Sequence, residues 1–288
     1  MKIAVLGSTG LLGQALLKFF NKKKCNVLGL ARKNADVNID ITNDKELLDF
    51  FENNNFDIII NTVAIVNHKF CEDNPGLAYQ INSHPASVIS EYTKIKGNYF
   101  IQISTDGYYS GDKNLKHKES DNIKLLNEYA RTKYAGEMFA LTDPNALVVR
   151  TNIVGFRGTP SQPTFVEWVI NSIKNNDEMT LFDDYFTSSI SVSQFSEALY
   201  SLVLKKPSGI FNLAGNHVSS KADFIQNLAK EFDLELKNPK IGSVESLVSS
   251  KRADSLGLDV SKAESLLGYN LPDLKSVIKQ LKKDYYEL

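Results

Sequence analysis

A tyrosine and a lysine four residues apart, Tyr129 and Lys133, have the clearest chemical potential in this sequence. They lie in the segment NEYARTKYAGE, whose composition predicts a helix, so both side chains would share one face a single turn apart. A tyrosine with an ordinary pKa of about 10 can give a proton to a growing alkoxide, and a nearby ammonium lowers that pKa. The pair therefore predicts an acid–base centre for the reduction of a carbonyl.

The spacing alone does not establish this role. A Tyr and a Lys at this separation are common on helix surfaces, and Tyr134 offers a second phenol in the same segment. Thr105 strengthens the catalytic interpretation, because it follows a predicted sheet strand and supplies a hydroxyl that would hold the substrate oxygen in line. We interpret Tyr134 as a packing residue.

A glycine loop upstream points to a dinucleotide cofactor. Residues 7–13, GSTGLLG, have the spacing G-x-x-G-x-x-G and stand between a predicted strand and a predicted helix. Glycines there permit a tight turn, close approach to a pyrophosphate and close packing of helix on sheet. The helix start would offer N–H groups and a partial positive charge to the phosphates. A purely structural glycine turn is the alternative.

The end of the second predicted strand, residues 26–31, favours NADP(H) over NAD(H). NAD-binding domains often place an acidic residue there to hold the ribose 2′-OH. Here Arg32 occupies the position, and no acid follows before Asp36. A guanidinium can pair with a 2′-phosphate, although Arg32 could also be a solvated basic residue, which leaves NAD(H) open. Asp40 could accept from the adenine amino group or form an Asx turn before Thr42.

Apolar runs alternate with amphipathic segments over the first 155 residues. Predicted strands cover residues 2–6, 26–31, 56–64, 98–105 and 146–155. Predicted helices cover residues 14–23, 43–54, 75–97 with a break near Pro85, and 128–141. This alternation predicts an α/β fold with a doubly wound parallel sheet of the Rossmann type. Ligands of such sheets bind beyond the carboxyl ends of the strands.

After Gly155 the alternation loosens. Helices are predicted at 163–176, 193–205, 220–232, 260–267 and 273–286, a strand at 209–215, and mixed strand and loop at 179–192. We expect this half to complete the sheet and to add a smaller, interwoven C-terminal lobe. The expected domains are residues 1–155 with 190–214 for NAD(P) binding, and residues 156–189 with 215–288 for substrate binding.

Composition narrows the classes of partner. The chain has 288 residues, with 33 Lys and Arg against 34 Asp and Glu. The absence of a basic excess argues against a nucleic-acid partner, and no apolar run reaches the length of a membrane span. Cys25 and Cys71 make no disulfide framework, which favours the cytoplasm. The four histidines have no metal-ligand spacing, so we expect no metal site.

The glycine loop, Ser104-Thr105-Asp106 and Tyr129-x-x-x-Lys133 together resemble the extended short-chain dehydrogenase/reductases. Within that family the chain is most similar to the dTDP-4-dehydrorhamnose reductases. The segments that carry this second likeness are FDIIINTVAIVNHKFCEDNPGLAYQIN, VVRTNIVG, FNLAG and RADSLGLDVSK. The resemblance extends over nearly the whole chain.

The resemblance implies a role for each matched residue. Tyr129 matches the proton donor, Thr105 the hydroxyl that orients the substrate, and Lys133 the partner of the tyrosine, which also binds the nicotinamide ribose. The matched cofactor positions are Gly7, Thr9, Gly10, Leu11, Leu12 and Gly13 for the pyrophosphate, Arg32, Asp40 and Ile41 for the adenosine end, and Val63 and Ala64 near the cofactor ribose.

The function implied is reduction of a nucleotide-linked 4-keto-6-deoxy sugar by NADPH, in deoxysugar and surface-polysaccharide synthesis. The substrate partner would be a nucleotide sugar, and a homodimer stays open. Sugar-nucleotide epimerases and dehydratases share the Tyr-x-x-x-Lys helix and are one alternative. However, dehydratases typically carry Glu where this chain has Gly107, and Arg32 argues against the tightly held NAD of epimerases. A non-catalytic, NADP-binding regulatory subunit is the other alternative.

Three departures from the family pattern fall outside the predicted cofactor site. Gly107-Tyr108-Tyr109 replaces an aromatic followed by Val-Phe or Val-Tyr, Ser188 replaces a proline, and Ala253 replaces the proline of an Arg-Pro pair. Arg252 in that pair could bind a nucleotide phosphate or serve as a structural arginine. We expect these changes to affect the sugar pocket.

Overall fold

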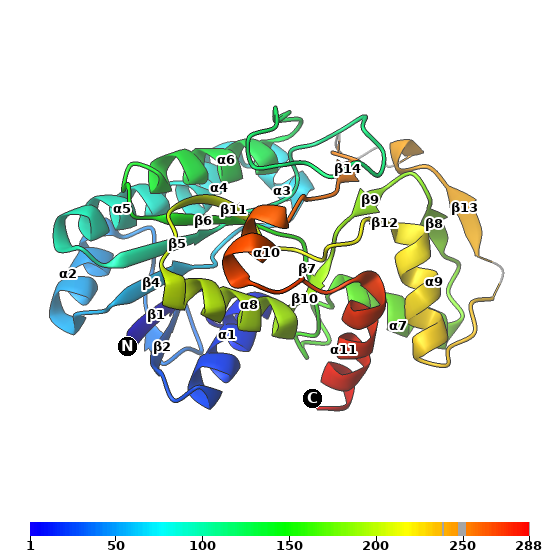
Figure 1. The fold of residues 1–288 in the computed structure, drawn as a ribbon, viewed down its shortest axis with the longest axis horizontal. Helices are drawn as coiled ribbons and strands as arrows, with labels where there is room; N and C mark the ends of the chain where they lie inside the picture. The colour runs from blue at the N-terminus through cyan, green and yellow to red at the C-terminus, as the bar shows by residue number, and fades with distance from the viewer. Residues whose placement is uncertain (238, 247–251, 288) are drawn as a thin grey trace. The chain divides into compact units, whose positions relative to one another are not determined.

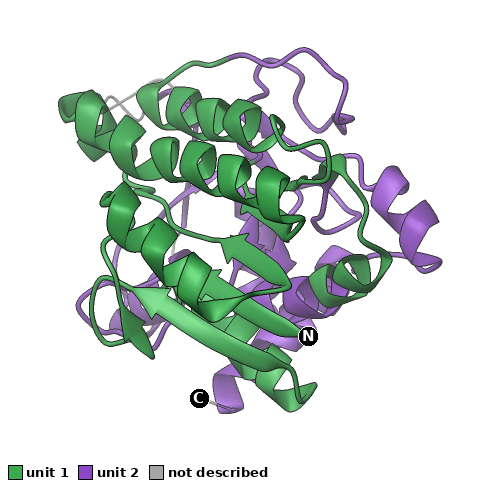
Figure 2. Cartoon of the chain, turned by 90° about the vertical axis from the view of Figure 1, so that its left-hand side faces the viewer, with its two compact units in different colours: residues 1–105, 125–150, 199–211 green, residues 106–124, 151–198, 212–288 purple. Residues whose placement is uncertain are grey.

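The computed structural model describes residues 1–237, 239–246 and 252–287 (Figure 1). The chain forms two compact units, which Figure 2 shows in different colours. Unit 1 consists of Met1–Thr105, Leu125–Arg150 and Leu199–Phe211, and unit 2 consists of Asp106–Lys124, Thr151–Ala198 and Asn212–Leu288. Each unit therefore draws on three separate stretches of the chain.

A seven-stranded sheet is the framework of unit 1. Its strands are β1 (Lys2–Leu6), β2 (Asn26–Ala31), β3 (Val37–Asn38), β4 (Ile58–Asn61), β5 (Tyr99–Ile103), β6 (Leu147–Arg150) and β11 (Gly209–Asn212). Their order is β11-β6-β5-β4-β1-β2-β3, and the pairs from β6 through to β3 are parallel. The predicted doubly wound parallel sheet is confirmed, with its change of strand order beside β1, the place where such sheets bind ligands.

The helices of unit 1 follow the predicted alternation. They are α1 (Leu11–Lys22), α2 (Asp44–Asn54), α3 (His68–Asp73), α4 (Pro75–Asn82), α5 (His84–Lys96), α6 (Glu128–Ala140) and the last part of α8 (Val192–Lys205). The predicted break near Pro85 is confirmed, because Pro85 lies in the first turn of α5, where its missing N–H costs nothing.

Apolar residues at strand and helix periodicity build the core of unit 1. Ala4 and Leu6 alternate on one face of β1 and pack in a cluster with Leu47 and Phe51 of α2 and Ile89 of α5. All four residues of β4 are buried. A parallel sheet covered by helices on both faces produces such continuous apolar strands, and it keeps the strand ends fixed as platforms for side chains.

The structure differs from the predictions at the strand of residues 146–155 and at the helix α3. The predicted strand at 146–155 ends at Arg150, and Ile153–Val154 forms a separate strand, β7, paired with β10. The short helix α3 was not predicted at all. Six residues are too few for a helical period to show in the sequence, and the capping of α3 by Asn67 resembles ordinary loop chemistry.

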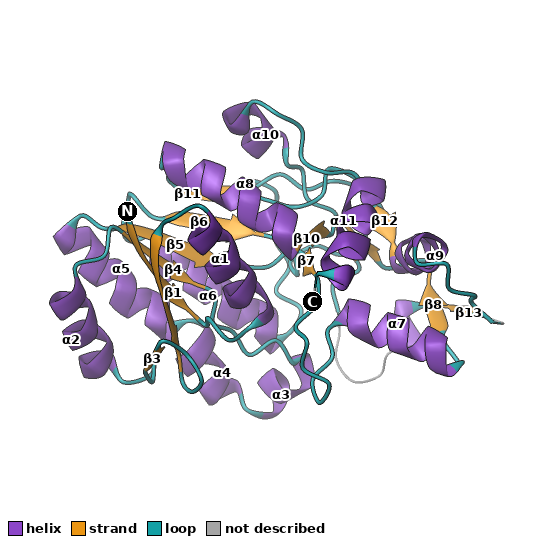
Figure 3. Ribbon diagram, turned by 90° about the horizontal axis from the view of Figure 1, so that it is seen from below, coloured by secondary structure: helices purple, strands orange, loops and turns teal. Residues whose placement is uncertain are grey.

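Unit 2 contains small sheets and four further helices. Its strands are β7 (Ile153–Val154), β8 (Thr180–Phe182), β9 (Phe186–Thr187), β10 (Ile190–Ser191), β12 (Ser219–Ser220), β13 (Lys240–Gly242) and β14 (Ser255–Leu256). Its helices are α7 (Phe165–Asn175), α9 (Lys221–Glu231), α10 (Ser261–Leu267) and α11 (Leu274–Tyr286), with a 3-10 turn at Val244–Ser246. In Figure 3, α9 lies next to β8, and α7 packs against α9. The core that these elements share includes Val169, Phe224 and Ile278.

The segment Asp106–Lys124 belongs to unit 2, where the His117 N–H donates to the Gly257 carbonyl at 2.9 Å. Tyr108 and Tyr109 are buried there, and the Tyr109 ring stacks on His117 with 4.1 Å between ring centroids. Burial lowers the pKa of His117, because the imidazolium would be poorly solvated. The departure from the family pattern at Tyr108-Tyr109 therefore supplies two buried aromatic side chains.

Candidate active site

The glycine loop can exist only with glycine at its critical positions. Gly7 has φ +81° and donates its N–H to the carbonyl of Leu30 at 2.8 Å. A Cβ on Gly7 would lie 2.6 Å from Thr62 Oγ1, and a Cβ on Gly13 would lie 2.2 Å from the carbonyl oxygen of Gly7. The loop is thus pressed between the end of β4 and the first turn of α1.

The start of α1 fits a diphosphate. Gly10 is its N-cap and has no side chain to accept from the first N–H groups, whereas Asn43 and Asn127 cap α2 and α6 through their side chains. A Cβ on Gly10 would meet only the Gly7 carbonyl oxygen, at 3.2 Å, so the outer side of the loop is open. Backbone donors and the positive end of a helix dipole suit a pyrophosphate.

The residues predicted for the adenosine end follow β2. Arg32 is exposed directly after this strand. Asp40 accepts from Thr42 through both the backbone N–H, at 3.0 Å, and the hydroxyl, at 2.8 Å. These two bonds, with the charge of Arg32, hold the pKa of Asp40 below its ordinary value. Asp40 thus forms an Asx turn while Ile41 is buried in the core, and their contact with adenine stays a prediction.

Val63 and Ala64 come directly after β4 and are half-buried. The predicted strand at 56–64 stops at Asn61, whose side-chain oxygen accepts from the Val63 N–H at 3.1 Å. A Cβ on Gly7 would lie 3.1 Å from Val63 Cγ2. The structure therefore brings Val63 against the glycine loop, although the two segments are far apart in the sequence.

Lys133 joins the predicted catalytic helix to the end of a sheet strand. Its Nζ donates to the carbonyl of Ile103 at 2.8 Å, which places the ammonium two residues before Thr105. Lys133 and Thr105 are buried, and Tyr129 is half-buried. Because Tyr129 and Lys133 are four apart on α6, they share a face of the helix. The structure thus brings this face of α6 to the end of β5.

Burial lowers the pKa of Lys133 to about 8, because the ammonium has lost most of its hydration. The carboxylate of Glu137 opposes this shift. Lys133 is therefore positively charged at neutral pH and loses its charge at mildly alkaline pH. A cation with this property can tune a neighbouring phenol.

A buried ion pair fixes α6 against the sheet. Arg150 of β6 donates through Nη2 to Glu137 Oε2 at 2.7 Å and through Nε to Glu137 Oε1 at 3.0 Å. Ser104 Oγ donates to the same carboxylate at 2.6 Å. The paired charges satisfy each other inside the core, and Glu137 lies one turn beyond Lys133. The ion pair therefore positions the face of α6 that carries Tyr129 and Lys133.

Asn82 is a site-supporting residue that the sequence analysis missed. Its side-chain oxygen accepts from the Ile65 N–H at 2.7 Å, and its amide nitrogen donates to Thr132 Oγ1 at 3.0 Å. It thereby ties the segment after β4 to α6. Gly136 permits the close approach, because a Cβ there would lie 2.7 Å from the Asn82 carbonyl. The signal of Asn82 in the sequence was its place at the end of the segment FDIIINTVAIVNHKFCEDNPGLAYQIN, which resembles the family.

His68 was also missed. It is the first residue of α3, and its ring stacks on Tyr129 with 4.8 Å between centroids and 24° between planes. Asn127 Nδ2 lies 3.4 Å from His68 Nδ1. In the sequence His68 is one of four scattered histidines, and it lies in the segment FDIIINTVAIVNHKFCEDNPGLAYQIN that resembles the family, but no pattern links it to Tyr129.

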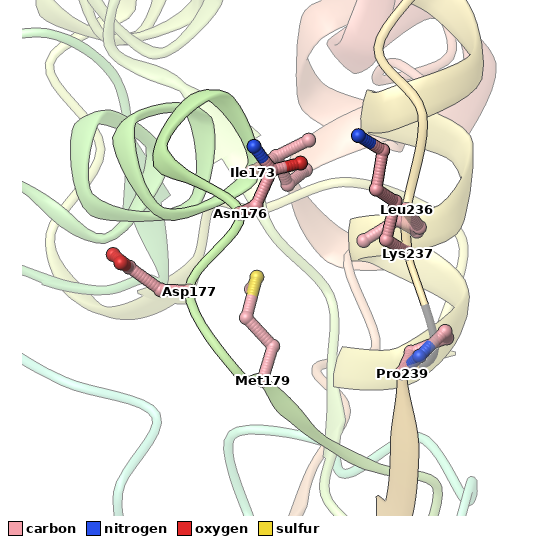
Figure 4. Close-up of a pocket in the computed structure, with 7 residues that line it drawn as sticks. All are labelled: Ile173, Asn176, Asp177, Met179, Leu236, Lys237 and Pro239. Carbon is pink, nitrogen blue, oxygen red and sulfur yellow. The ribbon is translucent and has the colours of Figure 1, made fainter.

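Other features do not compete with this site. A small pocket in unit 2, shown in Figure 4, is lined by Ile173, Asn176, Asp177, Met179, Leu236, Lys237 and Pro239, and contains none of the predicted residues. Within the described ranges, no group of three His, Cys, Asp or Glu side chains is arranged to hold a metal. No helix in the described part of the chain is long and apolar enough to cross a membrane.

Comparison with known sequences reveals relatives along the whole chain. The probable low-salt glycan biosynthesis reductase Agl14 of Haloferax volcanii is 25% identical, over 96% of each chain. A dTDP-4-dehydrorhamnose reductase of Sinorhizobium fredii is 26% identical, over 98% of this chain and 96% of its own. The methionine adenosyltransferase 2 subunit beta of Rattus norvegicus is 24% identical, over 94% of this chain and 84% of its own.

Solved structures share the fold. A dTDP-4-dehydrorhamnose reductase from Clostridium acetobutylicum superposes with a TM-score of 0.89 at 24% identity, over 100% of both chains. A dTDP-4-dehydrorhamnose reductase from Bacillus anthracis, in complex with NADP, gives 0.88 at 23% identity, over 100% of this chain and 99% of its own.

The family model described as the RmlD substrate binding domain matches residues 1–287. This match and the relatives named dTDP-4-dehydrorhamnose reductase confirm the family resemblance found in the motifs. The chain belongs to the family of the RmlD substrate binding domain.

Proposed function

We propose that the protein is an NADPH-dependent reductase of a nucleotide-linked 4-keto-6-deoxy sugar. The observation that supports the proposal is the bond from Lys133 Nζ to the Ile103 carbonyl, which brings α6 to the last residue of β5, two positions before Thr105. Relatives named as dTDP-4-dehydrorhamnose reductase and as a glycan biosynthesis reductase support a role in deoxysugar or polysaccharide synthesis.

We assign the cofactor to residues 1–155 with 190–214, and the nucleotide sugar to residues 156–189 with 215–288. The loop Gly7, Thr9, Gly10, Leu11, Leu12 and Gly13 would hold the pyrophosphate, Arg32, Asp40 and Ile41 the adenosine end, and Val63, Ala64 and Lys133 the riboses. When bound, NADPH supplies a hydride. The NADP complex of the Bacillus anthracis reductase supports the choice of cofactor.

The chain's own residues would manage the proton. As the substrate carbonyl is reduced, the Tyr129 hydroxyl donates its proton to the carbonyl oxygen, so that an alcohol forms and a phenolate is left. The Thr105 hydroxyl hydrogen-bonds the same oxygen and orients it. The positive charge of Lys133 would stabilise the phenolate that remains.

A panel of dTDP-, GDP-, UDP- and CDP-linked 4-keto-6-deoxy sugars tests the proposal, with loss of nicotinamide absorbance as the measurement. We expect at least one sugar to be reduced. Tyr129→Phe should lower kcat by about 10²–10⁴-fold, since it removes the proton donor. Tyr134→Phe, in the same helix, is the matched control and should stay near the wild type. Tight NADPH binding without turnover of any sugar would contradict the proposal.

Arg32 should decide the cofactor preference. Arg32→Ala removes the guanidinium proposed to pair with the 2′-phosphate, so we expect the Kd for NADPH to rise by about 10-fold and the Kd for NADH to change little. Fluorescence titration of both nucleotides measures the change, with Lys33→Ala as the neighbouring control. Equal losses for the two nucleotides would show that Arg32 does not read the phosphate.

A second candidate is a non-catalytic subunit that binds NADP(H). The similarity to the methionine adenosyltransferase 2 subunit beta favours it, because that protein is named as a subunit of another enzyme. The same glycine loop would serve both functions. NADPH binding without turnover across the sugar panel, together with binding to a partner enzyme, would favour this candidate.

We propose the cytoplasm as the place of action and a homodimer as the assembly to test. Cys25 and Cys71 are free thiols in the structure, which suits a reducing compartment. Size-exclusion chromatography with light scattering would settle the assembly.

A further inference from the structure

One face of the proposed proton donor is covered by an imidazole. The rings of His68 and Tyr129 have centroids 4.8 Å apart and planes 24° from parallel, which makes them a stacked pair. Aromatic pairs at centroid separations of about 4.5–7 Å attract each other beyond their burial of apolar area. The contact joins the first residue of α3 to the second residue of α6.

Each of the two helices that carry the stacked rings begins with an asparagine cap. Asn67 caps α3 by accepting from the Phe70 N–H at 2.9 Å, which fixes the helix turn that carries His68. Asn127 caps α6 by accepting from the Ala130 N–H at 2.8 Å.

Asn127 links the two helix starts directly. Since its side-chain oxygen is used by the cap, its amide nitrogen faces His68 Nδ1, at 3.4 Å. The amide donates and Nδ1 accepts, so a neutral imidazole would carry its proton on Nε2. The residue that begins the catalytic helix therefore also orients the ring that covers Tyr129.

The arrangement matters for proton transfer. Tyr129 is half-buried in the first turn of α6, where a side chain has more freedom than in the core. A proton donor has to be held in its productive geometry, and a misplacement of about 1 Å can cost on the order of 100-fold in rate. A flat ring against one face of the phenol restricts the rotation of the phenol. The phenolic oxygen lies in the plane of its own ring, so stacking on the face does not bond to it.

We propose that His68 is a positioning residue for Tyr129, whose ring it holds so that the phenolic hydroxyl faces the substrate carbonyl. This inference rests on the reductase function proposed above. It assigns to α3, the helix that the sequence did not reveal, a part in the catalytic geometry.

Steady-state kinetics of three variants tests the inference. In His68→Ala, kcat should fall by about 10- to 100-fold, while the KM for the sugar and the Kd for NADPH stay within about threefold of the wild type. His68→Phe retains a flat ring and should recover most of kcat. Lys69→Ala, the next residue of α3 and exposed, is the matched control and should leave kcat unchanged.

Thermal unfolding separates positioning from a merely structural role. If His68 only stabilises the fold, His68→Ala will lower Tm without changing kcat at temperatures where the protein is folded, and that result would overturn the inference. A His68→Phe variant as slow as His68→Ala would also overturn it, because the stacked ring would then not be what positions the phenol.

A measurement independent of turnover distinguishes failure of this inference from failure of the proposed function. In protein with ¹³C-labelled tyrosine rings, the Tyr129 resonances can be identified by their loss in Tyr129→Phe. They should be displaced in His68→Ala and unmoved in Lys69→Ala, which would support the contact even if no sugar is reduced. Tyr129 resonances unmoved in His68→Ala would overturn the inference whether or not the enzyme turns over.

Discussion

At the scale of single residues, Lys133 carries the positive charge that the proposed chemistry needs. Its burial lowers its pKa, so this charge is lost at a lower pH than in an exposed lysine. Its ammonium donates to the Ile103 carbonyl and is almost inaccessible to solvent. Desolvation brings its pKa down to about 8, from an ordinary value of about 10.4. In the proposed mechanism, Lys133 would therefore assist Tyr129 only below mildly alkaline pH.

This pKa predicts an alkaline limit to activity. As pH rises through about 8, Lys133 loses its proton, the phenolate of Tyr129 loses its stabilising charge, and kcat/KM should fall. The pH profile of kcat/KM measures this limb in the free enzyme. Lys133→Arg stays charged throughout the range, so the part of the limb that Lys133 sets near pH 8 should disappear even if the variant is slower. A wild-type profile flat up to pH 10 would contradict the assignment.

At the scale of elements, the start of α1 is built by close backbone contact. Gly13 lies so near the Gly7 carbonyl that one added methyl group would overlap it, at 2.2 Å. Backbone atoms on both sides leave no flexible side chain to move away. Loop and helix must therefore shift together if residue 13 is enlarged.

Gly13→Ala should damage cofactor binding more than folding. We expect the Kd for NADPH to rise by at least about 10-fold, and the free energy of unfolding to fall by about 1–3 kcal/mol from overpacking. Gly76→Ala is the control, because a Cβ at Gly76 in α4 meets nothing within 4 Å. That variant should bind NADPH normally. Equal affinities of the two variants would show that the loop tolerates the methyl group.

At the scale of the whole molecule, the chain folds into two units, and the catalytic residues predicted from the sequence all belong to unit 1. The buried pair Glu137–Arg150 holds a helix of this unit against its sheet, because it joins α6 to β6. Ser104, which follows β5, donates a further hydrogen bond to Glu137. Its side chains are 0% and 2% exposed, so neither charge can be compensated by water if its partner is removed.

Glu137→Gln should therefore destabilise the protein strongly. We expect the free energy of unfolding to fall by about 3–5 kcal/mol, because an unpaired guanidinium would remain buried. Glu52→Gln breaks the exposed pair with Lys96 and should cost less than about 1 kcal/mol. Denaturant unfolding followed by circular dichroism compares the two variants. Similar losses would mean that the buried pair is solvated more than the structure shows.

The sequence by itself determined the elements and the family. Strands such as β4 and helices such as α2, which Asn43 caps, follow from short-range periodicity and capping, which depend only on neighbouring residues. The glycine loop and the Tyr129–Lys133 spacing were sufficient to indicate the family because their geometry is local. The roles of the individual site residues stay predictions.

The tertiary structure alone decided which distant residues meet. Asn82 and Thr132 are separated by 50 positions, and His68 and Asn127 by 59, yet each pair shares a contact that supports α6. The pKa of Lys133 depends on burial by the surrounding fold, and the end of the predicted strand at Arg150 depends on the pairing of β7 with β10. Such contacts and solvation arise only when the chain has folded, because no local pattern of residues encodes which remote side chain will lie opposite.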